Sequence, residues 1–481
     1  MRSQKHPAQS AAEMAADEGS APAAHAPTPP IGSPSPEAAT LPNSSADGNA
    51  PPRMHSPNRQ QLLTAKTIDE LLEPDHPARD VWSYVEGLDL RPLYDRIRAR
   101  GSLAGRPAID PRLLVALWLY ATLSGFTSAR ELADLCNRHD AFRWLAGGVS
   151  VNYHTLADFR TDNPEFLEQL LKQSVELLRQ QGVIDLDRIA QDGMRVRASA
   201  GAASFRRRET LERLLQEAEA EIERLKAELA AMAAHPPVPQ GVTPGQASAG
   251  ASPSPQQEAA AMRHAEERLE RIEEALERLP EMEAKIKPEA AKQARVSTTD
   301  PEATVMKMAD GGYRPAYNIE YATACQGQVI VGVEVVTQGT DQGQLPPMID
   351  QIETRFGECP KKALVDGGFV NHKDITTLQS EKGCTVYAPV PKPRKEGVDP
   401  YQPKATDSEE VAEWRARMGT PEAKETYKDR AATAECANAQ ARNRGFEKIT
   451  VRGTEKVKSI ATWIALAHNM ARYFALQPQP S

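Results

Sequence analysis

Apolar residues recur at every third or fourth position from about residue 61 to residue 182, which is the spacing of one face of an α-helix. Asp110-Pro111 opens one predicted helix, because the missing N–H of proline is harmless in a first helical turn, and Ser124-Gly125 ends it. Ser128 and Glu131 form a capping-box pattern that starts a second helix after a short turn. We therefore predict an all-helical N-terminal domain over 61–182, in which these two helices are either a DNA-reading helix-turn-helix or plain scaffold.

Two later segments repeat apolar residues at alternating steps of four and three, the heptad spacing of a coiled coil. Their seams comprise Leu211, Leu215, Ala218, Ile222, Leu225 and Leu229, and then Met262, Ala265, Leu269, Ile272, Leu276 and Leu279. Residues 235–255 between them are rich in Pro, Gly and Ser and predict a flexible loop. We expect a helical-hairpin coiled coil over 211–285, whose helices pair with each other or with a second copy of the chain.

The pattern changes to strand-like alternation after Asp300. Residues 317–324 and 328–336 flank Gln326-Gly327 and predict a β-hairpin. Residues 362–366 and 384–389 predict further strands, and 188–192 predicts the first strand of the same sheet. With helices in the gaps, the fold class is α/β: a mixed-sheet core made of 183–210 and 286–476, with the coiled coil as an insertion.

The amino-acid composition predicts a disordered tail and argues against a membrane-spanning or secreted protein. Residues 1–60 are rich in Ala, Pro and Ser and have few large apolar groups, so we predict a disordered tail. The longest apolar run, residues 113–121, is far shorter than the roughly 20 residues of a membrane helix, so no membrane span is expected. The N-terminus lacks the apolar core of a secretory signal, which predicts a cytoplasmic protein. The five cysteines are scattered without the spacing of a zinc site or a disulfide framework.

The net charge of −8 at first argues against a nucleic-acid partner. Residues 212–289, however, hold 16 acidic residues against 9 Lys and Arg, a balance of −7, so nearly all the excess acidity belongs to the coiled coil. Basic clusters lie elsewhere: Arg195, Arg197 and Arg206 to Arg208; Lys392, Arg394 and Lys395; and Arg442, Arg444, Lys448, Arg452, Lys456 and Lys458. Each cluster is either a solvated face or a contact for a phosphate backbone.

Two aspartates, Asp192 and Asp366, each follow a short apolar run and precede glycine. Divalent cations such as Mg²⁺ prefer carboxylate oxygens, a strand end holds a short Asp side chain firmly, and the glycine leaves space for substrate. The pattern therefore indicates a metal site, although Asp-Gly also starts ordinary turns.

A third carboxylate, Glu435, lies in an Ala-rich segment that predicts a helix. Steps of eight and seven residues put Tyr427, Glu435 and Arg442 on one face of it, so a carboxylate shares that face with a cation that could hold phosphate. The alternative is an exposed Glu with an incidental Arg.

The chain resembles a known family, the DDE-type transposases of bacterial insertion sequences that have an N-terminal helical domain before an RNase H-like core. The resemblance covers roughly residues 62–476. It rests on Asp110-Pro-Arg-Leu-Leu, Ser128-Ala-Arg-Glu-Leu, His154-Thr-Leu-Ala-Asp-Phe-Arg160, Asp192-Gly-Met-Arg, Asp366-Gly-Gly-Phe, Arg430 to Gly445, and Arg452-Gly through Ala467-His-Asn469.

The resemblance implies that Asp192, Asp366 and Glu435 are a catalytic triad that converges to hold two Mg²⁺ ions, for which Mn²⁺ can substitute. It implies that Tyr427, Arg430 and Arg442 belong to the signature around the glutamate. With the basic clusters, the expected DNA contacts are Arg195, Arg197, Lys392, Arg394, Tyr427, Arg430, Arg442, Arg444 and Arg452. The expected partners are double-stranded DNA, as element ends and as target, and further copies of the chain in the bacterial cytosol. An RNase H-like nuclease without strand transfer and a non-catalytic DNA-binding adaptor remain alternatives.

Two departures from the family pattern concern this signature. Arg442 stands where relatives commonly have Lys, which preserves the charge but changes the geometry of a phosphate contact. Four residues, 431–434, separate Arg430 from Glu435 where three are usual. A regular helix would turn Arg430 about 140° away from Glu435.

Overall fold

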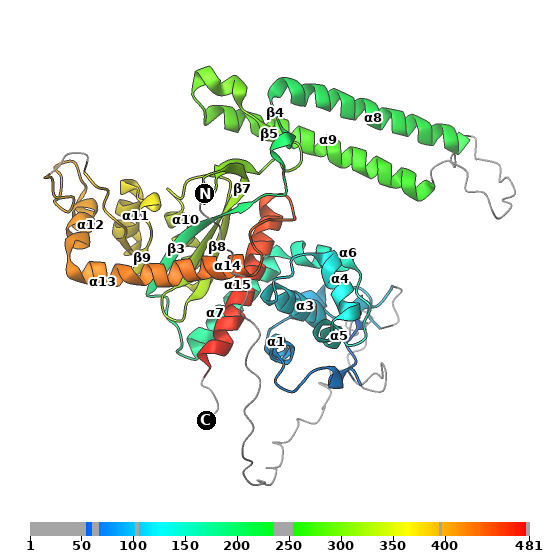
Figure 1. The fold of residues 1–481 in the computed structure, drawn as a ribbon, viewed down its shortest axis with the longest axis horizontal. Coiled ribbons are helices and arrows are strands. Elements are labelled where there is room, and N and C mark those ends of the chain that lie inside the picture. Colours follow the sequence, from blue (N-terminus) through cyan, green and yellow to red (C-terminus); the bar gives the residue numbers. More distant parts are fainter. Residues whose placement is uncertain (1–53, 60–66, 102–104, 235–253, 394–396, 478–481) are drawn as a thin grey trace, which may run out of the picture. The chain divides into compact units, whose positions relative to one another are not determined.

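The computed structural model describes residues 54–59, 67–101, 105–234, 254–393 and 397–477 (Figure 1). Most of the predicted tail, nearly all of the predicted loop 235–255, and Arg394 lie outside these residues. Residues 54–59 differ from the tail prediction. The short strand β1 (Met54–His55) pairs in parallel with β2 (Ala108–Ile109), and the Asn58 N–H donates to the Gly147 carbonyl.

The N-terminal segment is helical, as its apolar spacing predicts. Its elements are the 3-10 turn η2 (Asp69–Leu71) and the helices α1 (Pro77–Glu86), α2 (Arg91–Asp95), α3 (Pro111–Leu123), α4 (Ala129–Arg138), α5 (Asp140–Ala146), α6 (Tyr153–Thr161) and α7 (Pro164–Gln180). Asp110 caps α3 by accepting from the Arg112 N–H, and Ser128 caps α4 by accepting from the Glu131 N–H.

Within the described part of the chain, the main sheet has six strands and is mixed, so the predicted α/β class holds. In order across the sheet it runs β10 (Thr385–Tyr387), β9 (Lys362–Leu364), β3 (Arg188–Arg197), β7 (Tyr313–Ala324) and β6 (Thr304–Lys307), and β8 (Val329–Val336) also pairs with β7. The contacts among β10, β9 and β3 are parallel, whereas β7 is antiparallel to β3, β6 and β8. Strands β7 and β8 form the predicted hairpin.

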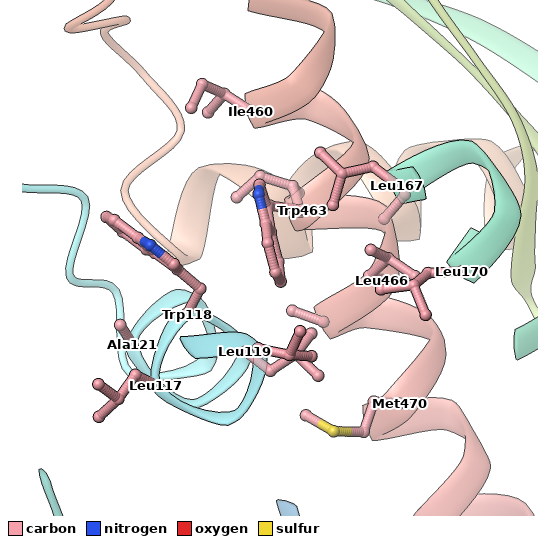
Figure 2. Packing of buried hydrophobic residues seen from close by; sticks show 14 of the residues in the cluster. Leu117, Trp118, Leu119, Ala121, Leu167, Leu170, Ile460, Trp463, Leu466 and Met470 are labelled. Carbon is pink, nitrogen blue, oxygen red and sulfur yellow. The ribbon is translucent and has the colours of Figure 1, made fainter. Parts of the chain in front are cut away.

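The N-terminal helices and the sheet share one hydrophobic core. Figure 2 shows the centre of this core, where residues of α3 and α7 surround Trp463 of the last helix, α15 (Thr454–Leu476). The same cluster continues into Met194 and Tyr321 of the sheet. Helix α15 joins the two parts because it is apolar along most of its surface and contacts α3, α7 and β8. None of the described helices could cross a membrane.

The insertion forms the predicted helical hairpin. Helices α8 (Arg208–Ala234) and α9 (Pro255–Ala284) run side by side (Figure 1), and seam residues such as Ala218 and Ile272 are buried between them. The Arg268 guanidinium donates to Glu221 across the hairpin (3.1 Å). Pairing within the chain therefore accounts for these seams. The hairpin joins the core through η3 (Ala202–Ser204), β4 (Phe205–Arg206), η4 (Pro288–Gln293) and β5 (Val296–Ser297).

The remaining elements complete the sheet's surroundings. They are α10 (Leu345–Phe356), η5 (Gly367–Phe369), α11 (His372–Lys382), α12 (Glu409–Gly419), α13 (Pro421–Arg430), a π-helical turn η6 (Ala431–Glu435) and α14 (Cys436–Asn443). Helices α13 and α14 continue each other through η6 (Figure 1), and η6 contacts both β3 and β7. This helical run therefore brings the predicted third carboxylate to the sheet.

Candidate active site

Asp192 lies in the middle of β3, not at a strand end as the sequence predicted. The strand continues through Gly193 because Met194 and Val196 are fully buried and the whole length pairs with β7. The Asp192 side chain is 20% exposed, and its Oδ2 accepts a hydrogen bond from Asn438 Nδ2 (3.0 Å). A strand interior fixes this carboxylate at least as firmly as a strand end would.

Asp366 follows β9, the neighbour of β3, as predicted. It caps the turn η5: its Oδ1 accepts from the Gly368 N–H (2.7 Å). The other oxygen, Oδ2, is left for a second partner. The two aspartates thus come from adjacent parallel strands, although 174 positions separate them in the sequence.

The 140° separation of Arg430 and Glu435 expected for a regular helix is wrong, because residues 431–435 form a π-helical turn. A π-turn pairs residues five apart where an α-helix pairs residues four apart, so it accommodates one extra residue. Arg430 Nη1 lies 3.6 Å from Glu435 Oε1 across this turn. The fourth residue between them is therefore absorbed by the backbone, and both side chains reach the same site.

All three predicted carboxylates gather around the Arg430 guanidinium. Its Nη2 lies 3.5 Å from Asp192 Oδ1 and 3.8 Å from Asp366 Oδ2, in addition to the contact with Glu435. The Arg430 side chain is only 13% exposed, whereas Glu435 is 64% exposed. Within the described residues, no three His, Cys, Asp or Glu side chains are already arranged around a common ion position. The Arg430 guanidinium lies between the three carboxylates instead.

Burial raises the pKa of Asp192 to about 6; Arg430 opposes the rise, while Asp366 and Asp341 add to it. Three carboxylates face one guanidinium, so the site carries an excess of negative charge. Tyr427 steadies the arrangement, because its hydroxyl donates to the Val365 carbonyl beside Asp366 (3.1 Å) and so ties α13 to the end of β9.

Four residues of this region were not predicted from the sequence. Asn438 holds Asp192, as described above. Asn318 and Glu320 of β7 and Asp341, in the loop before α10, lie on the other side of Gly193. Asn318 Nδ2 donates to Asp341 Oδ1 (2.6 Å) and Glu320 Oε1 (2.8 Å). Burial, followed by the charge of Asp341, raises the pKa of Glu320 well above its ordinary value. Polar residues at alternate positions of an otherwise apolar strand were the available signal.

Two protein-family models match parts of the chain. One, described as "Transposase domain (DUF772)", matches residues 66–162, and the other, described as "Transposase DDE domain", matches residues 380–474. The chain is therefore similar to DDE-type insertion-sequence transposases. No curated protein and no solved structure matches it.

The two matches bear unequally on the site of this transposase-like chain. The DDE match contains Tyr427, Arg430 and Glu435, whereas Asp192 and Asp366 lie outside both matched segments. The assignment of these two aspartates to the site therefore rests on their sequence motifs and on their position beside Arg430. The other match covers most of the N-terminal helices, α1 to α6.

The predicted DNA contacts fall into three groups. Arg197, Lys392, Arg442 and Arg452 are exposed, and Arg195 is one-third exposed, with its Nη2 donating to the Gly339 carbonyl (2.9 Å). Tyr427 and Arg430 are occupied within the site. Arg444 differs from the prediction: it is 8% exposed, packed under the end of α14, and does not offer its guanidinium to a phosphate. Arg394 lies outside the described residues.

Proposed function

We propose that this protein is a DNA transposase that cuts at the ends of its insertion sequence and joins the 3′ ends to target DNA. Asp192, Asp366 and Glu435 are the proposed catalytic carboxylates. The observation that carries the proposal is their approach, from β3, from the end of β9 and from the π-turn, to within 4 Å of one guanidinium.

The core is proposed to be RNase H-like. The DDE match supports this class, and so does a mixed sheet in which Asp192 and Asp366 come from adjacent parallel strands. In this arrangement the helix that carries Glu435 packs against the strand that carries Asp192.

The residues fit divalent cations. Their donors are carboxylate oxygens, which Mg²⁺ and Mn²⁺ prefer, and the three negative charges exceed the one charge of Arg430. When bound, two such ions would activate the attacking water or 3′-OH and stabilise the leaving oxygen. Asn438 keeps one Asp192 oxygen oriented, and Tyr427 keeps the Asp366 segment in place. Arg430 offsets part of the carboxylate charge before ions and DNA arrive and offers a cation to a phosphate afterwards.

Exposed basic side chains outside the hairpin would bind the DNA backbone, whose phosphates supply most of the affinity. Arg197, Lys392, Arg442 and Arg452 are the accessible candidates. Double-stranded element ends and target DNA are the proposed substrates, and bringing two ends together requires more than one copy of the chain.

The test is incubation of the protein with DNA that carries the ends of its own element and with a target plasmid, with and without Mg²⁺. We expect 3′ nicks at the ends and joined products only with the divalent ion. The variants Asp192→Asn, Asp366→Asn and Glu435→Gln should lose both products, whereas Asp350→Asn on the outer side of α10 should keep them.

Other outcomes decide against the proposal. Nicking without joined products would identify a nuclease, and sequence-specific binding without any cleavage would identify a DNA-binding adaptor. Full activity in the Glu435→Gln variant would remove Glu435 from the triad.

A further inference from the structure

Three oxygens from separate residues surround the open side of Gly193. A β-carbon built on this glycine would lie 2.6 Å from Asp341 Oδ1, 2.8 Å from Glu320 Oε1 and 2.9 Å from Asn318 Oδ1. The φ angle of Gly193 is one that any residue adopts, so its backbone does not demand a glycine. The missing side chain instead lets three oxygens lie close together over the α-carbon of Gly193, where any side chain would collide with them.

One of these oxygens has no partner. Asn318 is fully buried, and its Oδ1 accepts no hydrogen bond from any described residue. The orientation of the amide is fixed, because its NH₂ group donates to both Asp341 and Glu320. Turning the amide over would point its oxygen at two carboxyl groups. A buried oxygen without a donor is costly, and this one lies beside the two acidic side chains over the same face of Gly193.

We propose that Asn318, Glu320 and Asp341 form a divalent-cation site beside the triad. Two carboxyl groups and an amide oxygen are the donors that hard cations prefer. Among the described residues, Arg195 is the one cation that forms an ion pair with this group, and its Nη2 lies 3.9 Å from Asp341 Oδ2. A cation would satisfy the Asn318 oxygen and neutralise the carboxyl groups at once; a proton shared between Glu320 and Asp341 would leave that oxygen unsatisfied.

Asp341 would link this site to the triad. Its Oδ2 lies 3.3 Å from the β-carbon position of Gly368, and Asp366 Oδ1 lies 3.0 Å from the same point. Gly193, directly after Asp192, and Gly368, two residues after Asp366, therefore both border Asp341. The ion's influence on catalysis rests on the proposed function, whereas its binding does not.

The test measures Mn²⁺ binding to the full-length protein without DNA, by calorimetry and by the electron paramagnetic resonance signal of free Mn²⁺. Two variants disrupt the proposed site in different ways. Asp341→Asn removes a charge, and Gly193→Ala pushes the three oxygens apart without changing any charge. We expect each to bind one Mn²⁺ fewer than the parent protein, or to hold it at least about tenfold more weakly.

Two further variants separate this site from the triad. Asp350→Asn, on α10, removes a comparable carboxylate outside the cluster and should bind Mn²⁺ as the parent does. Glu435→Gln should weaken only the triad ions; if it changes nothing while Asp341→Asn still loses an ion, the triad assignment fails and this site stands. Parental binding in both Asp341→Asn and Gly193→Ala would overturn the inference, and so would loss of the same ion in Asp350→Asn. Circular dichroism verifies that each variant is folded.

Discussion

Arg430 is the residue on which the charge balance of the site depends. Its guanidinium is within 4 Å of three carboxylates and is mostly buried, so no water shell compensates for its loss. Arg430→Gln should lower the free energy of unfolding by about 1–3 kcal/mol in the absence of divalent ions, because like charges are then left together. Mg²⁺ should raise the melting temperature of this variant more than that of the parent. Thermal unfolding with and without Mg²⁺ measures both effects.

The conservative variant Arg430→Lys supplies the control. It keeps one positive charge, so its melting temperature should stay closer to that of the parent protein. Equal Mg²⁺-induced shifts in the parent and in Arg430→Gln would show that the guanidinium and the ions do not share the carboxylates.

Asp192 gives the site a pH dependence. Its pKa is raised from 3.8 to about 6, chiefly by burial, so the folded state binds this proton more tightly than the unfolded state. The stabilisation is fully present below pH 3.8 and is lost as the pH rises through 6. Without divalent ions, Asp192→Asn should therefore be more stable than the parent by about 1–3 kcal/mol at pH 8, and the difference should shrink toward pH 4. Denaturant unfolding at several pH values measures it; a difference independent of pH would contradict the raised pKa.

At the scale of elements, the π-turn Ala431–Glu435 absorbs one residue. Deleting the exposed Ala431 should convert it into regular α-helix, with Arg430 and Glu435 four apart and still on one face. We expect stability within about 1 kcal/mol of the parent, since no buried side chain is removed. Chemical denaturation measures it, and circular dichroism should show unchanged helix content.

A deletion in regular helix is the matched control. Removing the exposed Ala439 from α14 leaves no bulge to absorb the change, so the following residues turn by about 100° and the buried Ala441 leaves its site. This variant should be strongly destabilised. If deleting Ala431 is as damaging as deleting Ala439, the turn is not a one-residue insertion in an otherwise regular helix.

The elements also show what the sequence could predict. The hairpin of β7 and β8, the caps of α3 and α4 and the seams of α8 and α9 depend on neighbours in the sequence, and their patterns predicted them. The continuation of β3 beyond Gly193 depends on pairing with β7 more than a hundred positions away. The π-turn depends on contacts of the helix with β3 and β7. No local sequence pattern predicts the continuation of β3 or the π-turn.

The same distinction applies to the candidate site. Asp192, Asp366 and Glu435 could be singled out because each sits in a local motif. Asp341 and Asn318 have no such motif: they are 23 positions apart and meet only after β8 has folded back onto β7. Arg444 was expected at the surface because it is charged, whereas it is buried at the end of α14.

At the scale of the whole molecule, the shared core ties the N-terminal helices to the sheet. Trp463 of α15 donates its indole N–H to the Arg160 carbonyl of α6, and Asn469 bonds both the N–H and the carbonyl of Ile330 in β8. Both residues of α15 are buried. Helix α15 therefore holds together two segments that are far apart in the chain.

The α8–α9 hairpin packs in a hydrophobic cluster of its own, apart from the two larger cores. Its base residues Leu211, Ala275 and Leu279 form a small cluster with residues 294 and 296, separate from the two larger cores. Its surplus of about seven negative charges repels a phosphate backbone, which favours a protein partner over DNA. We infer that the hairpin acts in assembly of paired ends and is not needed for the core to fold.

Replacing residues 211–279 by a short Gly/Ser linker tests this inference. The variant should stay folded, because the larger cores lose none of their residues, and it should still bind Mn²⁺ and nick single element ends. Joining of paired ends should fall markedly, because contacts between copies are lost. Gel-based nicking and joining assays, with light scattering of the DNA complexes, measure these outcomes. A variant that joins paired ends as well as the parent would reduce the hairpin to a passive spacer, and one that fails to fold would make it part of the core.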